Sequence, residues 1–328
     1  MSMRRIIIVG GAGFIGSHFT DHLLARPTTT QVTLYDNFTS GREWHYDHHA
    51  DDARLTVVKG DVKDADLLTS SMEGHDLVIH LASNPDIAKA MTDPTIDFDE
   101  GTYLTHRVVE AMRVAGVGTM VYASGSGVYG DLGQIEAHED HGPLVPTSTY
   151  GASKLAGEAL ISSYCAMFDL RGAAFRFGNV VGPRQTHGVG FDFVRRLLDD
   201  PTTLRILGDG GQSKSYIHVD DVVMAVLGVA EPTASGPTGA YRAFNVATGD
   251  YITVTEIAEL ALEVLGLDPA TVHLDYTGGD RGWRGDVPVV RLSTDRIRST
   301  GWRCDRPTRA ALRASLVAML PDARLGRL

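Results

Sequence analysis

Cysteine is scarce in this chain of 328 residues, which contains only Cys165 and Cys304. Two cysteines cannot build a disulfide framework or a cysteine-rich zinc site, and such scarcity is typical of proteins from a reducing compartment. Long apolar runs are also missing, since no segment approaches the ~18 residues of a membrane span. The apolar run after Arg5 is too short for the core of a signal peptide. We therefore expect a cytoplasmic protein.

Basic residues are fewer than acidic residues in this chain. Lys and Arg number 30 against 41 Asp and Glu, which gives a formal net charge of −11. A protein that grips nucleic acid or an anionic membrane needs a positive surface, so neither partner is expected. A local basic pocket for a small phosphate ligand remains compatible with this charge. The apolar fraction of 43% and the charged fraction of 22% are ordinary for a globular protein.

Short apolar runs alternate with segments of helical spacing over the first half of the chain. Residues 5–9 (RIIIV) form a continuous β-branched run, as expected of a strand buried on both faces of a parallel sheet. Further strands are predicted at 31–35, 55–58, 76–81, 119–123 and 172–177, with helices from the first glycines to about residue 24, at 97–115 and at 150–168. This alternation predicts an α/β fold with a doubly wound parallel sheet.

The second half is less regular. Helices are predicted at 190–198, 220–230, 253–265 and 307–319, strands at 204–207 and 243–246, and a surface loop at 231–240. We expect residues 1–181 to form a dinucleotide-binding domain. Residues 182–328 are expected to form a smaller mixed α/β region for the substrate, with some segments returning to the first domain.

A glycine-rich turn follows the first strand. Gly10, Gly13 and Gly16 open a helix there, which is the arrangement that lets a pyrophosphate approach the backbone and the helix N-terminus. Asp36 ends the second strand, where a carboxylate accepts hydrogen bonds from both ribose hydroxyls and repels a 2′-phosphate. The turn therefore predicts a Rossmann domain that binds NAD rather than NADP. Asp61, after the third strand, is placed for the adenine edge.

Tyr150 and Lys154 lie four residues apart at the start of a predicted helix, so they share one face. A lysine ammonium is expected to lower the pKa of the phenol and to contact the nicotinamide ribose. A phenol with a lowered pKa can remove an alcohol proton while hydride leaves the same carbon. The pair follows the fifth strand, at the end of the sheet where doubly wound folds bind ligands.

Ten motifs extend these signals along nearly the whole chain: GGAGFIGSH, YDNFTSG, GDV, HLAS, VYG, YGASK, RFGNVVGPR, GDGGQSKSYIHVDD, FNVATGD and a second GDV. In this order they resemble the extended short-chain dehydrogenases/reductases, in the NAD-dependent nucleotide-sugar epimerase/dehydratase branch. The UDP-galactose (UDP-glucose) 4-epimerases are the most similar type. The resemblance implies tightly held NAD, transient oxidation of a sugar hydroxyl, and homodimers that pair the helices near 97–115 and 153–168.

The resemblance also implies two sets of binding residues. The cofactor set comes from the ends of the strands and from the Tyr/Lys helix: Gly10, Gly13, Phe14, Ile15, Gly16, Asp36, Asn37, Ser40, Gly41, Asp61, Val62, Leu81, Ala82, Ser83, Tyr150, Lys154 and Phe177. The substrate set is Ser124, Ser126, Tyr150, Asn179, Asp192, Phe193, Lys214, Arg281, Arg284 and Asp286. Within it, Asn179, Lys214 and one of the two arginines are expected at the diphosphate. Asp286 is expected at the nucleoside ribose.

One catalytic position departs from the family pattern. Relatives carry a Ser or Thr where the segment YASGSGVYG has Gly125, with Ser124 and Ser126 on either side. Either serine is a candidate for the third catalytic hydroxyl, and both have the alternative of capping local backbone. Related 4,6-dehydratases carry an Asp-Glu pair just before VYG, and related decarboxylases a Glu. Ser126 and Gly127 hold those places here, and neither acts as a carboxylic acid or base.

These residues predict a UDP-sugar 4-epimerase with bound NAD. Two alternatives stay open: a nucleotide-sugar dehydrogenase or ketoreductase with net redox turnover, and a non-catalytic NAD-binding scaffold. The sequence does not identify the sugar. No metal site is predicted, because His187 has no second ligand at metal spacing and the loop histidines His45, His48 and His49 read as a solvated patch.

Overall fold

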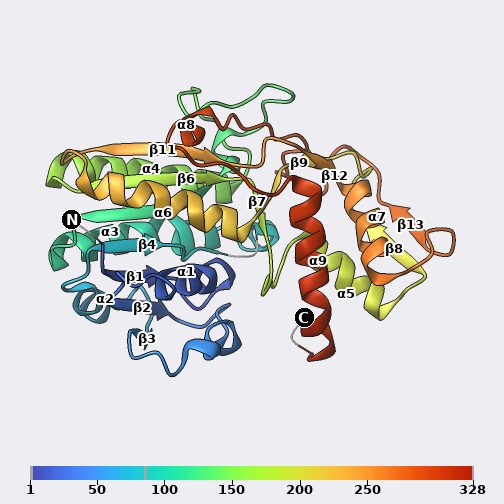
Figure 1. Ribbon diagram of the computed structural model, residues 1–328. Coiled ribbons are helices and arrows are strands. Elements are labelled where there is room, and N and C mark those ends of the chain that lie inside the picture. The colour runs from blue at the N-terminus through green and yellow to red at the C-terminus, as the bar shows by residue number, and fades with distance from the viewer. Residues whose placement is uncertain (1–2, 85–86, 327–328) are drawn as a thin grey trace. The chain divides into compact units, whose positions relative to one another are not determined.

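The computed structural model describes residues 3–84 and 87–326, and Figure 1 traces its elements along the chain. Two compact units interleave in sequence. The first holds the chain up to Val128 together with Thr149–Arg176 and Val223–Phe244. The second holds Tyr129–Ser148, Phe177–Val222 and the chain from Asn245 onward. Among the described residues, no helix is long and apolar enough to cross a membrane.

A seven-stranded sheet organises the first unit, in the order β11-β6-β5-β4-β1-β2-β3. The pairings from β3 to β5 are parallel, as in Ile7 of β1 against Thr33 of β2 and Val78 of β4. Because β4 lies beside β1, the strand order reverses there, and doubly wound sheets bind ligands at the carboxyl ends of strands at such a point. The predicted fold class is confirmed. The strands are β1 Arg5–Val9, β2 Gln31–Asp36, β3 Leu55–Lys59, β4 Leu77–His80, β5 Thr119–Gly125, β6 Arg171–Phe177 and β11 Tyr241–Val246.

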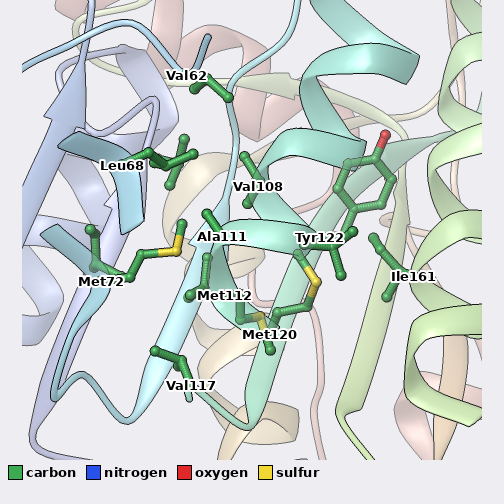
Figure 2. Close-up of a cluster of buried hydrophobic side chains, with 14 of the residues drawn as sticks. Val62, Leu68, Met72, Val108, Ala111, Met112, Val117, Met120, Tyr122 and Ile161 are labelled. Atoms are coloured by element: carbon green, nitrogen blue, oxygen red, sulfur yellow. The ribbon is translucent and has the colours of Figure 1, made fainter. Parts of the chain in front are cut away.

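Helices cover the sheet. They are α1 Phe14–Leu24, α2 Ala65–Met72, α3 Leu104–Ala115, α4 Thr149–Phe168 and α6 Val219–Ser235. A core cluster joins α2, α3 and α4 to β1, β4 and β5, and Figure 2 shows Leu68, Val108, Met120 and Ile161 within it. In β1, Ile7 belongs to this cluster, and strand alternation turns its two neighbours to the opposite face. All three side chains are buried, which explains the continuous apolar run.

The second unit has short strands and three longer helices. Its own core cluster links α5 Val189–Asp199, α7 Val254–Leu265 and α9 Thr308–Arg324. Thr253 begins α7 with a capping box to Glu256, and Gly266 ends it in the left-handed region. The strands form two-stranded sheets: β7 Asn179–Val181 with β10 Tyr216–His218, β9 Ser213–Lys214 with β12 Ile252–Thr253, and β8 Thr203–Ile206 with β13 His273–Tyr276.

Two sequence predictions about elements need correction. The predicted helix at 97–115 begins as a π-helix, η4 Phe98–Tyr103, before it becomes α3. A side chain at Gly101 would place its Cβ 2.5 Å from Oγ of Ser153, so η4 approaches α4 closely there. The predicted loop at 231–240 is helical as far as Ser235. The hydroxyl of Thr233 donates to the carbonyl of Val229 (2.9 Å) in this last turn of α6, which composition does not reveal.

Candidate active site

The turn after β1 requires glycine. Gly10 has φ +85°, and a Cβ there would lie 2.6 Å from the amide nitrogen of Ala82. That close approach arises because the amides of Leu81 and Ala82 both donate to the carbonyl of Val9, at 2.8 and 2.9 Å. The chain leaving β4 therefore crosses directly over the glycine turn, which brings these members of the predicted cofactor set together.

Helix α1 starts at this turn with its N-terminus uncapped by a side chain. Gly13 occupies the N-cap position, and the first turn contains no acidic residue. A Cβ at Gly16 would lie 2.6 Å from the carbonyl oxygen of Gly11, so the helix packs tightly against the turn. Phe14 is buried and Ile15 half-buried. Free amides and the positive end of the helix dipole suit a pyrophosphate, which is the group expected here.

Asp36 at the end of β2 is oriented by the backbone around it. Its side chain is buried and accepts hydrogen bonds from the amides of Ala12 (2.9 Å) and Phe38 (2.8 Å). Burial raises the pKa of this carboxyl, and the two amide bonds oppose that rise. Each oxygen keeps lone pairs for ribose hydroxyls, so the residue fits the role predicted from sequence. Gly41 is equally constrained, since its Cβ would approach Oδ1 of Asp36 to 2.9 Å.

The adenine side is more open. Asp61 is exposed, accepts from the amide of Lys63 (2.8 Å), and receives a long hydrogen bond of 3.3 Å from Nδ2 of Asn37. Val62 beside it is buried, and Ser40 is half-buried. Their roles toward adenosine remain predictions. Phe177, the last residue of β6, is buried and belongs to the second unit.

Tyr150 and Lys154 lie in the first two turns of α4. The Nζ atom of Lys154 is 5.5 Å from the centroid of the Tyr150 ring and donates to the carbonyl of Ala123 (2.8 Å). Lys154 is only 3% exposed. Burial lowers the pKa of this ammonium to about 8, although Asp97 and Glu158 oppose the change. The predicted pair is thus brought together.

The structure does not show the lowered pKa that was expected for Tyr150. Burial raises the pKa of the phenol to about 12, the charge of Asp97 adds to the rise, and the nearby Ser83 hydroxyl opposes it. The physical reason is that a phenolate would lose hydration in this site and would be repelled by the anion of Asp97. Tyr150 therefore carries its proton at neutral pH.

Asp97 is a member of the site that sequence analysis missed. It is 1% exposed and accepts from Nδ2 of Asn84 (3.0 Å) and from Oγ1 of Thr149 (2.7 Å), the first residue of α4. Its charge raises the pKa of both Tyr150 and Lys154. No local motif marks it, because the contact depends on how the segment before η4 packs against α4.

Ser124, one of the two candidate hydroxyls, belongs to a buried ionic network. Its Oγ donates to Oε1 of Glu158 at 2.6 Å. Arg176 donates to the same carboxylate through Nε (3.0 Å) and Nη2 (2.7 Å), and the hydroxyl of Tyr241 adds a bond of 3.2 Å. The side chains of Arg176 and Glu158 are each 5% exposed. The proton of the Ser124 hydroxyl is therefore committed to Glu158, and a role of Ser124 toward the substrate stays a prediction.

Glu158 and Arg176 were also missed, although the sequence holds a signal for each. Glu158 lies four residues beyond Lys154 on the same helical face. Arg176 interrupts an apolar strand, and a charge in a buried strand needs a partner.

Ser126, the other candidate, begins the 3₁₀ turn η5 Ser126–Tyr129. It is half-buried, and its hydroxyl has no hydrogen-bond partner among the described residues. The turn passes close to the start of α4, since a Cβ at Gly127 would lie 3.4 Å from Cα of Gly151. A Cβ at Gly125 would meet nothing within 4 Å. Of the two candidate serines, Ser126 is thus the one whose hydroxyl is not committed to another side chain.

Four residues of the predicted substrate set gather in the second unit. Lys214 of β9 donates to Oδ1 of Asp286 at 2.6 Å, and Arg281 donates to the carbonyl of Asp286 at 2.7 Å. Asn179 begins β7, and its amide donates to the carbonyl of Ser215 (3.0 Å), the residue after Lys214. Arg281 also pairs with Asp131 at 2.7 Å. Lys214, predicted at a diphosphate, and Arg281, one of the two candidate arginines, are thus each paired with a carboxylate.

The remaining substrate candidates differ from this group in their burial and in their ion pairs. Phe193 is 3% exposed and packs in the core cluster of the second unit, so its ring is not available to a ligand. Asp192 is half-exposed and lies 3.9 Å from Arg195. Arg284 is exposed and forms no ion pair with a described residue. These residues stay predictions, and for Phe193 a backbone contact is the remaining possibility.

The three loop histidines do not form the solvated patch that was predicted. His45 is fully buried, and its Nδ1 lies 2.8 Å from the carbonyl of Ala12 in the glycine turn. His48 and His49 turn instead toward Asp21 of α1. His187 is exposed and joins no group of metal-ligating side chains in the part of the chain that the structure describes.

The doubly wound sheet, the glycine turn and the Tyr150/Lys154 pair together form the arrangement expected of a dinucleotide-dependent enzyme. Comparison with known proteins identifies the family. The NAD dependent epimerase/dehydratase family matches residues 6–247. The UDP-glucose 4-epimerase of Mycolicibacterium smegmatis is 36% identical over 91% of this chain and 93% of its own length. The chain therefore belongs to the NAD-dependent epimerase/dehydratase family.

Solved structures agree with this assignment. A crystal structure of a UDP-galactose 4-epimerase superposes with a TM-score of 0.85 at 34% identity, covering 97% of this chain and 99% of that one. A double mutant of the dTDP-glucose 4,6-dehydratase of Streptomyces venezuelae, solved with NAD, gives 0.87 at 28% identity over 98% of both chains. The protein is thus an enzyme of an NAD-dependent family that includes both epimerases and dehydratases. The free amides of α1 and the carboxylate of Asp36 fit that cofactor.

Proposed function

We propose that the protein epimerises a UDP-sugar at C4 by transient oxidation. Tyr150 takes the proton of the sugar 4-hydroxyl and later returns it. Lys154 holds the ribose next to the nicotinamide and supplies positive charge near the phenol. Bound NAD supplies reversible hydride acceptance at the same carbon. The 4-keto sugar rotates within the site and is then reduced on its opposite face, so no cofactor is consumed.

The observation that carries this proposal is the combination of the Tyr150/Lys154 pair with the turn η5, which contains no carboxylate. The Nζ atom of Lys154 lies 5.5 Å from the centroid of the Tyr150 ring, with Lys154 buried and Tyr150 half-buried. Ser126 and Gly127 stand where related dehydratases and decarboxylases have acids. Elimination of water needs a proton donor on the departing oxygen, whereas epimerisation needs no group beyond the pair.

Product analysis tests the reaction. The protein as purified is incubated with UDP-, dTDP- and GDP-sugars, and the sugars are separated by chromatography. We expect a C4 epimer of a UDP-sugar without net NADH. A 4-keto-6-deoxy sugar would identify a dehydratase, and stoichiometric NADH a dehydrogenase. Either product, or no turnover of any sugar, would overturn the proposal.

The role of Tyr150 is tested by Tyr150→Phe, which keeps the ring and removes the hydroxyl. We expect kcat to fall by at least ~10²-fold, the scale of a general base, with substrate affinity roughly kept. Tyr276→Phe is a matched control, because Tyr276 is 38% exposed and lies in the second unit on β13. Full activity in Tyr150→Phe would refute the mechanism.

A further inference from the structure

Asp21, His48 and His49 bring three ligand atoms to one point on the first unit. Asp21 lies in α1, and the two histidines lie in the short 3₁₀ turn η2 Asp47–His49, in the connection between β2 and β3. Oδ1 of Asp21 is 2.8 Å from Nε2 of His48 and 2.8 Å from Nε2 of His49. All three ligand atoms lie within 4.8 Å of one another.

Carboxylate oxygen and imidazole nitrogen are preferred ligands of Zn²⁺, and three protein ligands plus a water complete a tetrahedron. Bonds of about 2.0–2.1 Å to such an ion place the ligand atoms ~3.3 Å apart. The present spacing of 2.8 Å to Asp21 is therefore slightly too tight, and small outward shifts of the side chains would admit the ion. The exposed fractions of 46% for His48, 22% for His49 and 31% for Asp21 leave a path for the ion and a coordinating water.

We propose that Asp21, His48 and His49 form a binding site for a divalent transition-metal ion, with Zn²⁺ as the best match. None of the three belongs to the cofactor or substrate residues. The proposal therefore does not depend on the reaction.

The position of the site gives the ion a structural role. The loop that carries both histidines is already fixed at its near end, where the amide of Arg42 donates to the carbonyl of Ala12 (3.0 Å) and Nδ1 of His45 lies 2.8 Å from the same oxygen. An ion held by His48, His49 and Asp21 would fix the far end of this loop to α1. The β2–β3 connection would then be held at two places, at the glycine turn through Ala12 and at α1 through Asp21.

The alternative is that no ion binds and the two imidazole N–H groups share the carboxylate of Asp21. This alternative predicts the same contacts but no metal uptake. A titration separates the two. The purified, NAD-loaded protein is treated with a chelator, exchanged into chelator-free buffer and titrated with ZnCl₂ in a calorimeter.

We expect one Zn²⁺ per chain, and lower affinity in Asp21→Asn, His48→Ala and His49→Ala. Each variant removes a direct ligand, so its affinity should fall by at least about tenfold, the lower limit seen when only a supporting residue is lost. His273→Ala is the matched control, since His273 is exposed and lies in the second unit on β13. It should bind Zn²⁺ like the parent.

Co²⁺ provides a second readout, because its visible absorption strengthens in a tetrahedral field. The parent loaded with Co²⁺ should show these bands, and His48→Ala should lose them. Absence of Zn²⁺ uptake by the parent, or uptake that persists in Asp21→Asn and His48→Ala, would overturn the site. Neither result would bear on sugar turnover, so failure of this proposal is distinguishable from failure of the proposed function.

Discussion

Substitutions at Ser124 and Ser126 are expected to separate stability from catalysis. Ser124→Ala removes the 2.6 Å hydrogen bond to the buried carboxylate of Glu158. A hydrogen bond to a charged group contributes about 1.5–3 kcal/mol to the free energy of unfolding. Its loss should lower the stability of the fold, while Glu158 keeps its bidentate contact with Arg176. With an unfolding entropy of ~2.1 cal/mol/K per residue over 328 residues, Tm should fall by about 2–4 °C. We expect kcat to change little.

Ser126→Ala should lower kcat and leave Tm unchanged. The hydroxyl of Ser126 has no partner among the described residues, so its removal should leave Tm within the error of the measurement. If this hydroxyl aligns Tyr150 with the sugar, one hydrogen bond of ~1–2 kcal/mol is lost in the transition state, and kcat falls by roughly tenfold or more.

Gly125→Ser supplies the third arm of the test. A Cβ at Gly125 would meet no atom within 4 Å, and its backbone is not in the left-handed region, so serine fits without strain. The single variant should keep or raise activity, and Gly125→Ser combined with Ser126→Ala should regain much of the lost kcat. Thermal unfolding and kcat are measured for all four variants on the identified sugar. If Ser126→Ala turns over like the parent, or Ser124→Ala loses kcat at unchanged Tm, the assignment of the hydroxyl is wrong.

Three further predictions address the charge, the cofactor and the assembly. Asp97→Asn removes an anion that raises the pKa of Tyr150. The acidic limb of the kcat/KM pH profile should therefore move to lower pH. Asp99→Asn, at an exposed position, should leave this limb in place. The denatured protein should release NAD, and Asp36→Ala should weaken NAD retention and reduce its preference over NADP; a parent that contains no NAD and prefers NADP would contradict this. The exposed apolar residues of α3 and α4 predict a homodimer, and Ala159→Arg on the exposed side of α4 should shift sedimentation from dimer to monomer.

The features that depend on local sequence were predictable. The run RIIIV, the glycines after it and Asp36 specify strand, turn and carboxylate within one βαβ unit, and the structure reproduces this order. Tyr150 and Lys154 were found because a spacing of four residues places side chains on one helical face. In each case the residues that define the feature are close in the chain, so their geometry follows from the element that carries them.

The features that depend on packing were not predictable. Asp97 meets Thr149 across 52 positions of sequence, and Asp21 meets His48 across 27. His45 was assigned with His48 and His49 to a solvated loop patch, yet its ring is buried against the glycine turn. Such contacts depend on the path of a loop, which composition does not determine.

Burial and the nearby buried charges explain why Tyr150 holds its proton. Glu158 is matched by the bidentate Arg176, so that pair contributes little net charge at the phenol. Lys154 is left facing both Tyr150 and the anion of Asp97, and its ammonium is itself weakened by burial, with a pKa of about 8. Burial is the main reason that the pKa of Tyr150 rises to about 12, and the negative charge of Asp97 adds to the rise. Ser83 is the described side chain whose hydroxyl lowers the pKa of this phenol, and deprotonation near neutral pH needs further positive charge or hydrogen bonds at the phenol oxygen.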